Sequence, residues 1–283
     1  MDIGFIGLGN LGRAICKRLS DMEQNLIVYN RNKEKIKDLS YEKVGNPKEL
    51  LEKCDLIFLC LFDSNAVKNV FEMENGLLCE SLKGKIIIDL TTNHYGEVLE
   101  FHKVVKDFGG EYLETPVFGS VAPALKGEVT VVSSGEQEVF EKAKVVLEKF
   151  AKEIFFLPTP SSATKMKLIN NLCLGSFMAT LAECTALAEN CEIDKSKALE
   201  ILGVGGGQSL VLKAKTQKLI DEDFSPHFSN NAINKDLHLL QDLAYNLKMP
   251  LYTASIPKEL FSKMKNLGKG EEDFSSIYQL FKN

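Results

Sequence analysis

The feature that most constrains the fold is a glycine pattern at the start of the chain. Gly7-Leu8-Gly9-Asn10-Leu11-Gly12 follows a short apolar run, 2–6, and precedes a helical pattern that extends to about Met22. Between a strand and a helix, Gly-x-Gly-x-x-Gly is typical of dinucleotide binding. The three glycines allow a tight bend, a close approach of backbone to a pyrophosphate, and close packing of helix on strand. We therefore predict a dinucleotide whose phosphates face the N-terminus of this helix.

The end of the second expected strand, 26–29, bears on the identity of the dinucleotide. About 20 residues beyond the glycines, an NAD site usually places an acidic residue on the ribose 2′-hydroxyl group. This chain has neutral Asn30 and cationic Arg31 there. A guanidinium group suits a 2′-phosphate through forked, charge-assisted hydrogen bonds, although a solvated turn arginine is the alternative. We predict NADP, bound by Asn30 and Arg31 together with the glycine turn.

Short apolar strands and helical patterns alternate through the first half of the chain. Further strands are expected at 55–61, 85–90, 111–113, 129–134 and 154–157, and further helices at 47–53, 65–72, 96–108 and 137–150. Such alternation predicts an α/β fold with a doubly wound parallel sheet.

Two loops of this sheet are candidate ligand contacts, because ligands bind beyond the carboxyl ends of such strands, and a third loop contains a turn considered on other grounds. Leu61 and Phe62 begin the first loop, and Thr92 lies in the second. Thr92 either reaches the ribose of the nicotinamide or caps the next helix. In the third loop, Phe118-Gly119-Ser120 forms a turn whose N–H groups can bind an anion. Taken alone, this last feature is only a turn.

A long helical pattern, 161–190, follows the expected sheet. Its apolar residues fall on nearly every side, which predicts a helix enclosed by protein. Lys167 and Asn171 are four residues apart and therefore lie on one face of this helix. A buried lysine is costly unless its amine reaches a cavity or a partner. The alternative is a buried stem whose amine extends into water.

The rest of the chain has helical patterns only, at 195–202, 210–220, 231–247 and 255–265, with a glycine-rich break at 203–207 that we interpret as a hinge. We therefore expect two domains. The first, 1–160, binds the nucleotide, and the second, 161–283, is all-helical and serves substrate binding and oligomerisation. The long apolar helix suggests that helical faces are shared between subunits, so we expect a homodimer or a homotetramer.

Composition narrows the class of protein. Among 283 residues, 45% are hydrophobic and 26% charged, and the net charge of −5 argues against nucleic acid as a partner. No apolar run approaches roughly 18 residues, so we expect no membrane span, and the N-terminus lacks a signal-peptide pattern. The four histidines show no ligand spacing, which predicts no metal. Seven cysteines without a Cys-x-x-Cys pair, among them Cys60 and Cys173 in apolar runs, suggest reduced, packed thiols in a cytoplasmic protein.

Several motifs occur in a recognisable order. They are the glycine turn, Asp89-Leu90-Thr91-Thr92, Thr115-Pro116-Val117-Phe118-Gly119-Ser120, Lys165-Met166-Lys167-Leu168-Ile169-Asn170-Asn171, Lys235-Asp236-Leu237 and Gly270-Glu271-Glu272-Asp273-Phe274-Ser275. Together these motifs span nearly the whole chain. Their residues and their order resemble those of the β-hydroxyacid dehydrogenase family. That family includes 3-hydroxyisobutyrate dehydrogenases and glyoxylate/succinic semialdehyde reductases, and the Asn30-Arg31 turn is similar to that of the NADP-using reductases.

The resemblance implies an N-terminal Rossmann domain, a long interdomain helix and an all-α C-terminal domain. It also implies that Lys167 is the catalytic lysine, that Asn171 helps to hold it and the substrate, and that Lys235 serves both cofactor and substrate. The alternative for Lys235 is a solvated helix lysine beside Asp236. Three positions depart from the family pattern: Phe118 replaces a usual serine, Ser161 and Ala163 replace glycines, and His94 replaces a small residue.

The expected reaction is hydride transfer between NADP(H) and a small aldehyde, keto acid or β-hydroxy acid, with Lys167 as general acid or base. The substrate carboxylate would bind the N–H groups of Gly119 and Ser120, assisted by Lys235. Three alternatives remain open: a non-catalytic NADP-binding sensor, a structural oligomer-forming protein, and an imine or ketone reductase with a non-carboxylate substrate. Because imine reductases replace the lysine, Lys167 favours a carbonyl or alcohol substrate.

Overall fold

The computed structural model describes residues 2–282 and divides into two compact units, 1–167 and 168–283. The first unit contains a nine-stranded sheet. Its strands are β1 (Asp2–Ile6), β2 (Asn25–Tyr29), β3 (Glu42–Lys43), β4 (Leu56–Leu59), β5 (Ile86–Asp89), β6 (Glu111–Glu114), β7 (Val117–Phe118), β8 (Val129–Ser134) and β9 (Ala151–Leu157).

The sheet follows the order β3-β2-β1-β4-β5-β6-β8-β7, with β9 paired to β8. From β3 to β6 all pairs are parallel, whereas β8 runs antiparallel to β6 and β7 and parallel to β9. The expected doubly wound sheet is therefore confirmed, but it is not parallel throughout. Its antiparallel part arises because the chain reverses direction through β7 and one short helix before β8.

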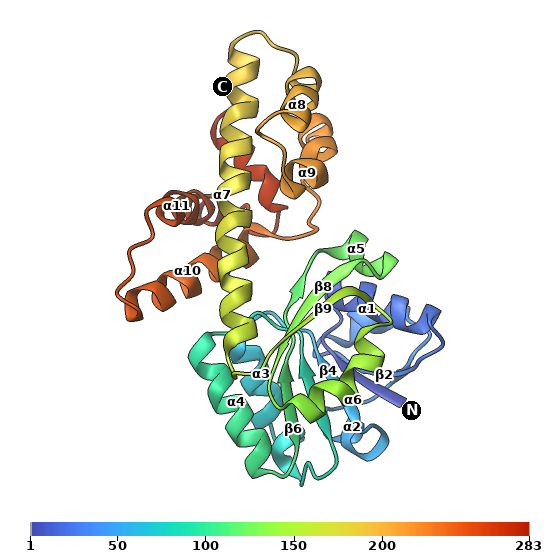
Figure 1. Cartoon of the computed structure of the whole chain (residues 1–283). Coiled ribbons are helices and arrows are strands. Elements are labelled where there is room, and N and C mark those ends of the chain that lie inside the picture. Colours follow the sequence, from blue (N-terminus) through green and yellow to red (C-terminus); the bar gives the residue numbers. More distant parts are fainter. Residues whose placement is uncertain (1, 283) are drawn as a thin grey trace. The chain divides into compact units, whose positions relative to one another are not determined.

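Helices cover both faces of this sheet (Figure 1). The helices are α1 (Asn10–Asp21), α2 (Lys48–Lys53), α3 (Ser64–Glu72), α4 (Tyr95–Asp107), α5 (Val121–Lys126) and α6 (Gln137–Leu147), with short 3₁₀ turns η1 (Lys33–Ile36) and η2 (Leu77–Cys79). Buried residues of α1, α5 and α6 share one core with the sheet, and those of α2, α3 and α4 share another. Two cores on opposite faces are what strands buried on both sides require.

The second unit is helical, as expected. Helix α7 (Ser162–Asn190) begins in the first unit and continues into the second, where it is followed by α8 (Lys195–Val204), α9 (Leu210–Asp221), α10 (Asn230–Asn246), α11 (Tyr252–Asn266) and the 3₁₀ turn η3 (Phe274–Leu280). Side chains of Asp194, Ser209 and Ser229 accept hydrogen bonds from backbone N–H groups and thereby cap the N-termini of α8, α9 and α10.

Helix α7 bears on two expectations: the absence of a membrane span stays a prediction, and enclosure of the helix on nearly every side is wrong. Its most apolar 18-residue window reaches a mean hydropathy of 1.2, so α7 is long and apolar enough to cross a membrane by length and composition. That is weak evidence, because core helices pass the same test. The helix is also not enclosed on every side: only 44% of that window is buried, and Cys173, expected to be packed, is exposed. Large apolar side chains of α7, among them Ile169, Phe177 and Leu187, are exposed.

Candidate functional site

The glycine turn lies between β1 and α1, and two of its glycines are required by their surroundings. A Cβ on Gly7 would lie 2.3 Å from the carbonyl oxygen of Cys60, and the φ of Gly7 is +97°. A Cβ on Gly12 would lie 2.1 Å from the carbonyl oxygen of Gly7, so the helix packs directly on the turn. Gly9, in contrast, has nothing within 4 Å of its Cβ position. The turn thus offers an open backbone surface at the N-terminus of α1, which fits a dinucleotide pyrophosphate.

The remaining residues of the turn are held from β2. Leu8 is buried, and its N–H group donates to Oδ1 of Asn30 at 3.0 Å. The Nδ2 group of Asn30 donates to the carbonyl oxygen of Asn32 at 2.7 Å. Asn30 therefore braces the turn, whereas Arg31 is exposed beside it and Asn10 and Leu11 begin α1.

The loops after β4 and β5 are joined by hydrogen bonds. The N–H group of Leu61 donates to Oγ1 of Thr91 at 3.0 Å, and Phe62 is exposed. Thr92 is only partly buried, and it does not cap the following helix. The cap of α4 is His94, whose Nδ1 accepts from the N–H group of Gly96 at 3.1 Å. The alternative that Thr92 caps this helix is therefore wrong. The capping role also explains why His94 stands where the family usually has a small residue.

A buried carboxylate that sequence analysis missed organises these loops. Asp89 accepts hydrogen bonds from the N–H group of Thr91 at 2.9 Å, from Nδ2 of Asn93 at 2.8 Å and from the hydroxyl group of Tyr112 at 2.7 Å. Burial raises the pKa of Asp89, and these bonds oppose that rise. The sequence signal was present as Asp-x-Thr-x-Asn at the end of a buried strand.

The first turn of α7 is fixed to the sheet unit at several points. The hydroxyl group of Ser161 donates to the carbonyl oxygen of Tyr95 at 2.7 Å, and the N–H group of Ala163 donates to Oγ of Ser134 at 2.8 Å. Oε2 of Glu114 accepts from both the N–H group and the hydroxyl group of Thr164. Ser161 and Ala163, which stand where the family usually has glycines, thus help to anchor the start of α7.

Lys167 follows one turn later and is only 6% exposed. Its Nζ lies over the ring of Phe118, 5.0 Å from the ring centroid. Phe118 ends β7 and is partly buried, and it leads into Gly119, whose φ of +142° and close approach to Val129 favour glycine. The first unit therefore brings together the predicted lysine and the predicted turn Phe118-Gly119-Ser120.

In the second unit, Asp236 links two predicted residues. Nδ2 of Asn171 donates to Oδ2 of Asp236 at 2.6 Å, and Nζ of Lys235 donates to Oδ1 of the same carboxylate at 2.7 Å. The Lys235 side chain is 16% exposed and lies beside Asp236, as the alternative of a helix lysine paired with Asp236 describes, and its role toward cofactor and substrate stays a prediction. Asp236 was not predicted as a site residue. Its Lys-Asp-Leu motif was the available signal.

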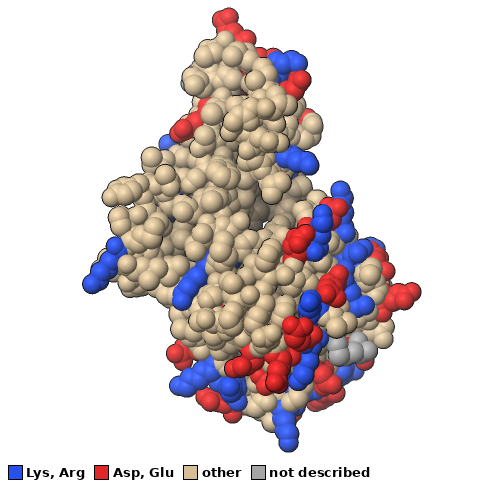
Figure 2. Space-filling model, viewed as in Figure 1, with Lys and Arg blue, Asp and Glu red and all other residues tan. Residues whose placement is uncertain are grey.

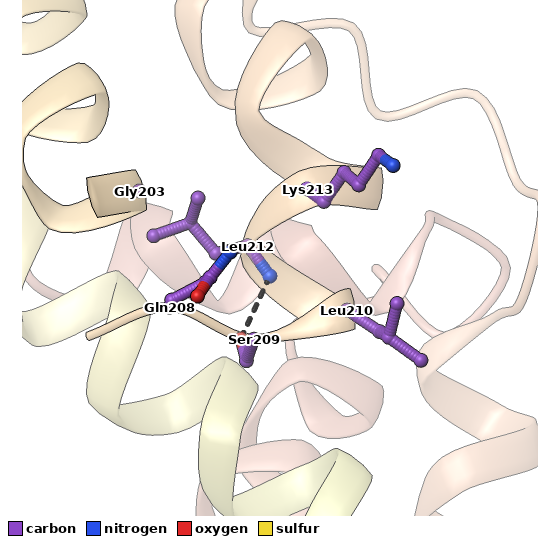
Figure 3. A pocket seen from close by; sticks show the side chains of 6 residues that line it. All are labelled: Gly203, Gln208, Ser209, Leu210, Leu212 and Lys213. Carbon is purple, nitrogen blue, oxygen red and sulfur yellow. Dashed lines mark hydrogen bonds between the residues drawn. The ribbon is translucent and has the colours of Figure 1, made fainter. Parts of the chain in front are cut away.

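The second unit also contains a hollow of about 510 Å³ at the connection between α8 and α9 (Figure 3). It is lined by Gly203, Gln208, Ser209, Leu210, Leu212 and Lys213. Ser209 accepts from the N–H group of Leu212 at 3.0 Å, as its helix-capping role requires. None of the predicted site residues lines this hollow. Among residues 2–282, no group of three His, Cys, Asp or Glu side chains is arranged to hold a metal ion.

Comparison with known protein families matches both parts of the chain. Residues 2–158 match the family described as the NAD binding domain of 6-phosphogluconate dehydrogenase. Residues 161–281 match the family described as NAD-binding of NADP-dependent 3-hydroxyisobutyrate dehydrogenase. The two matches meet near the start of α7 and together cover almost the whole chain.

Individual relatives agree with this assignment. Over 99% of its length the chain is 32% identical to the cytokine-like nuclear factor N-PAC of Gallus gallus, but it spans only 51% of that protein. It is 28% identical to glyoxylate/succinic semialdehyde reductase 1 of Arabidopsis thaliana, with 100% of this chain and 99% of the relative covered.

A solved structure described as Psf3 in complex with NADP+ and 2-OPP superposes with a TM-score of 0.91 at 25% identity, covering 98% of this chain and 99% of the other. The descriptions of both matching families name NAD binding, and the glycine turn fits a dinucleotide. The chain belongs to the β-hydroxyacid dehydrogenase family.

Proposed function

We propose that this chain is an NADP-dependent oxidoreductase that transfers a hydride between NADP(H) and a small aldehyde, keto acid or β-hydroxy acid. The observation that carries the proposal is the buried ammonium group of Lys167, held at the start of α7 beside the turn after β7. A buried amine on an anchored helical turn fits the role of a proton donor better than the alternative of an amine that extends into water. Glyoxylate, succinic semialdehyde and 3-hydroxyisobutyrate represent the expected substrates.

The choice of NADP rests on the end of β2. Asn30 is occupied with the glycine turn, which leaves Arg31 as the charged side chain at the place where a ribose 2′-group would lie. A guanidinium group there favours a 2′-phosphate. The relative Psf3 is described in complex with NADP+, which supports the same choice.

A nicotinamide cofactor held at the glycine turn would supply the hydride for reduction of a carbonyl carbon. The developing alkoxide oxygen accepts a proton from Nζ of Lys167, and the neutral amine afterwards regains a proton from water. General acid catalysis of this kind is typically worth about 10²–10⁴-fold. Asn171 lies four residues beyond Lys167 on α7, and its amide is held by Asp236. Within the first unit, the N–H groups of Gly119 and Ser120 are the groups that we assign to the substrate's carboxylate, and the assistance expected from Lys235 stays a prediction.

A second candidate function is a non-catalytic NADP-binding module. It is favoured by the 32% identity to N-PAC, which is described as a nuclear factor and of which the chain spans about half. The buried, anchored Lys167 favours the enzyme, because a binding module has no need of that amine. Cytoplasmic localisation and homo-oligomer formation stay predictions.

The test is a turnover assay with NADPH and with NADH against glyoxylate, succinic semialdehyde and methylmalonate semialdehyde. NADPH-dependent reduction of at least one of them, with a lower rate for NADH, is the expected result. Tight NADPH binding without turnover on any of the three would favour the binding module. Absence of both binding and turnover would leave only a structural role.

A further inference from the structure

We propose that Asp89 is a positioning residue of the cofactor site. Its carboxylate holds the loops after β4 and β5 in one arrangement, on the side of the site that takes the nicotinamide half of the dinucleotide. Asp89 is fully buried and acts through Thr91 and Asn93 rather than by touching the cofactor. The inference rests on the NADP binding proposed above, and it holds whichever substrate is reduced.

The sheet places this carboxylate next to the point where the strand order reverses. Strand β1 lies between β2 and β4, and β5 follows β4. In such sheets a dinucleotide binds across the carboxyl ends of the strands at this point, with its pyrophosphate at the glycine turn and its adenosine ribose near the end of the second strand. The end of β2 therefore serves the adenosine half, which leaves the loops after β4 and β5 for the nicotinamide half.

The loop after β4 is packed against the glycine turn itself. A Cβ on Gly7 would lie 2.3 Å from the carbonyl oxygen of Cys60 and 2.8 Å from Cδ2 of Leu61. Cys60 and Leu61 directly follow β4. A displacement of this loop would therefore change the wall of the site next to the turn that faces the pyrophosphate.

Two hydrogen-bonded connections join this loop to the loop after β5. The N–H group of Leu61 donates to Oγ1 of Thr91 at 3.0 Å. The hydroxyl group of Ser64 donates to Oδ1 of Asn93 at 3.2 Å and accepts from the N–H group of His94 at 2.8 Å. The side chains of Ser64, Thr91 and Asn93 are buried, so a lost partner in either connection leaves an unsatisfied polar group.

Each connection ends on one oxygen of Asp89. Oδ1 accepts from the N–H group of Thr91 at 2.9 Å, and Oδ2 accepts from Nδ2 of Asn93 at 2.8 Å. The hydroxyl group of Tyr112 donates to Oδ2 at 2.7 Å and so ties the carboxylate to β6. All three partners donate, which suits an ionised carboxylate, because that group only accepts. Since a buried charge contributes little net stability, we expect its effect on the arrangement of the loops.

Two ligands separate the halves of the site. NADPH occupies both halves, whereas adenosine 2′,5′-bisphosphate represents only the adenosine half with its 2′-phosphate. Calorimetry measures the Kd of each for the wild type, Asp89→Asn, Thr91→Val and Thr91→Ser. Asp55→Asn is the matched control, because Asp55 is an exposed aspartate just before β4, at the opposite end of that strand. Arg31→Ala is the contrasting variant, since it should raise the Kd of both ligands.

Asp89→Asn should raise the Kd of NADPH at least about tenfold, because either orientation of the new amide sets an N–H group against a donor. Thr91→Val keeps the shape of the side chain but removes the acceptor for Leu61, and should raise this Kd at least about threefold. Thr91→Ser keeps the hydroxyl group and should stay within about twofold of the wild type. The Kd of the bisphosphate should change by less than about twofold in all three variants and in Asp55→Asn.

The comparison of the two ligands distinguishes positioning from general destabilisation. An unchanged Kd of NADPH in Asp89→Asn or in Thr91→Val would overturn the role, and so would an equal rise in the Kd of both ligands. If Asp89→Asn does not fold, the pair Thr91→Val and Thr91→Ser decides the question. A wild type that binds neither ligand would reject the proposed function together with this inference, whereas a wild type that binds NADPH as tightly as both variants would reject this inference alone.

Discussion

Asn30 and Arg31 are adjacent in sequence but have different tasks at the end of β2. Asn30 accepts from the N–H group of Leu8 and so shapes the glycine turn, whereas Arg31 is exposed. We therefore expect Arg31 alone to provide the preference for a ribose 2′-phosphate over a 2′-hydroxyl group.

We predict that Arg31→Ala raises the Kd of NADPH by about tenfold to a hundredfold, because hydrogen bonds to charged groups contribute about 1.5–3 kcal/mol. The Kd of NADH should change by less than about threefold, since NADH lacks the phosphate. Fluorescence titration of both cofactors measures this, with Lys33→Ala on the adjacent 3₁₀ turn as control. An equal rise in the Kd of NADPH and of NADH would contradict a role for Arg31 in binding the 2′-phosphate.

Site residues with a local sequence signal could be predicted, and those that depend on distant partners could not. Gly7 and Gly12 belong to a motif whose spacing indicates their structural role, whereas the catalytic role of Lys167 follows from the family resemblance and stays a prediction. Asp236 was missed because its partner Asn171 lies 65 positions away. Thr91 was passed over for Thr92 because only folding shows which of the two hydroxyl groups meets Leu61.

At the scale of elements, apolar patterning predicted most helices and strands to within a few residues. It missed β3 and β7, which have two residues each and therefore no periodicity to detect. The antiparallel direction of β8 was also missed, because strand pairing depends on contacts that the local pattern does not contain.

The junction of β6, α4 and α7 contains a pair of buried side chains with opposite pH behaviour. Nε2 of His102 lies 4.0 Å from Oε1 of Glu114, and neither atom has a hydrogen-bond partner among the described residues. Burial raises the pKa of Glu114 to about 7 and lowers the pKa of His102 to about 4. The pair is therefore neutral in the folded state across the weakly acidic range.

These two groups should have opposite effects on stability. Folded Glu114 binds a proton more tightly than the unfolded chain does, where a glutamate has its ordinary pKa of 4.5, so its contribution is lost as pH rises through about 7. Folded His102 binds a proton less tightly than the unfolded chain does, where a histidine has its ordinary pKa of 6.5, so its contribution is lost as pH falls toward about 4. In the wild type the two slopes largely cancel between pH 4.5 and 6.5.

We predict that Glu114→Gln makes the free energy of unfolding rise with pH relative to the wild type across this window, whereas His102→Asn makes it fall. Each difference should reach on the order of 2–3 kcal/mol. Urea unfolding at half-unit pH intervals measures the slopes, and differences from the wild type cancel the contributions of other carboxylates. Slopes of the same sign in both variants would contradict the assigned protonation states.

In the second unit, large apolar side chains are exposed at the connection between two helices. Where α8 meets α9, Val204 is 86% and Leu210 is 84% exposed, beside the hollow that Leu212 also lines. On the face shown in Figure 2, charged residues gather over the first unit, whereas the helices of the second unit show mostly uncharged residues. An uncharged apolar surface is complementary to itself, which suits a symmetric contact between identical subunits.

We predict that the chain forms a dimer or a larger homo-oligomer at micromolar concentration. The double variant Val204→Asp, Leu210→Asp should shift the mass measured by light scattering toward the monomer, because burying a carboxylate in an interface is costly. Val145→Asp on α6 places the same charge on an exposed valine of the first unit and should leave the mass unchanged. A monomeric wild type, or an unaffected double variant, would rule out this surface as the contact.

Proton donation by Lys167 can be separated from cofactor binding by comparing two lysine variants with the wild type. The kcat for the best aldehyde and the Kd of NADPH are measured for the wild type, for Lys167→Ala and for the control Lys165→Ala, which alters a lysine of the same helix. We predict that Lys167→Ala lowers kcat by about 10²–10⁴-fold and leaves the Kd of NADPH within about threefold. Lys165→Ala should change neither quantity. A Lys167→Ala enzyme that keeps its kcat would contradict proton donation by Lys167.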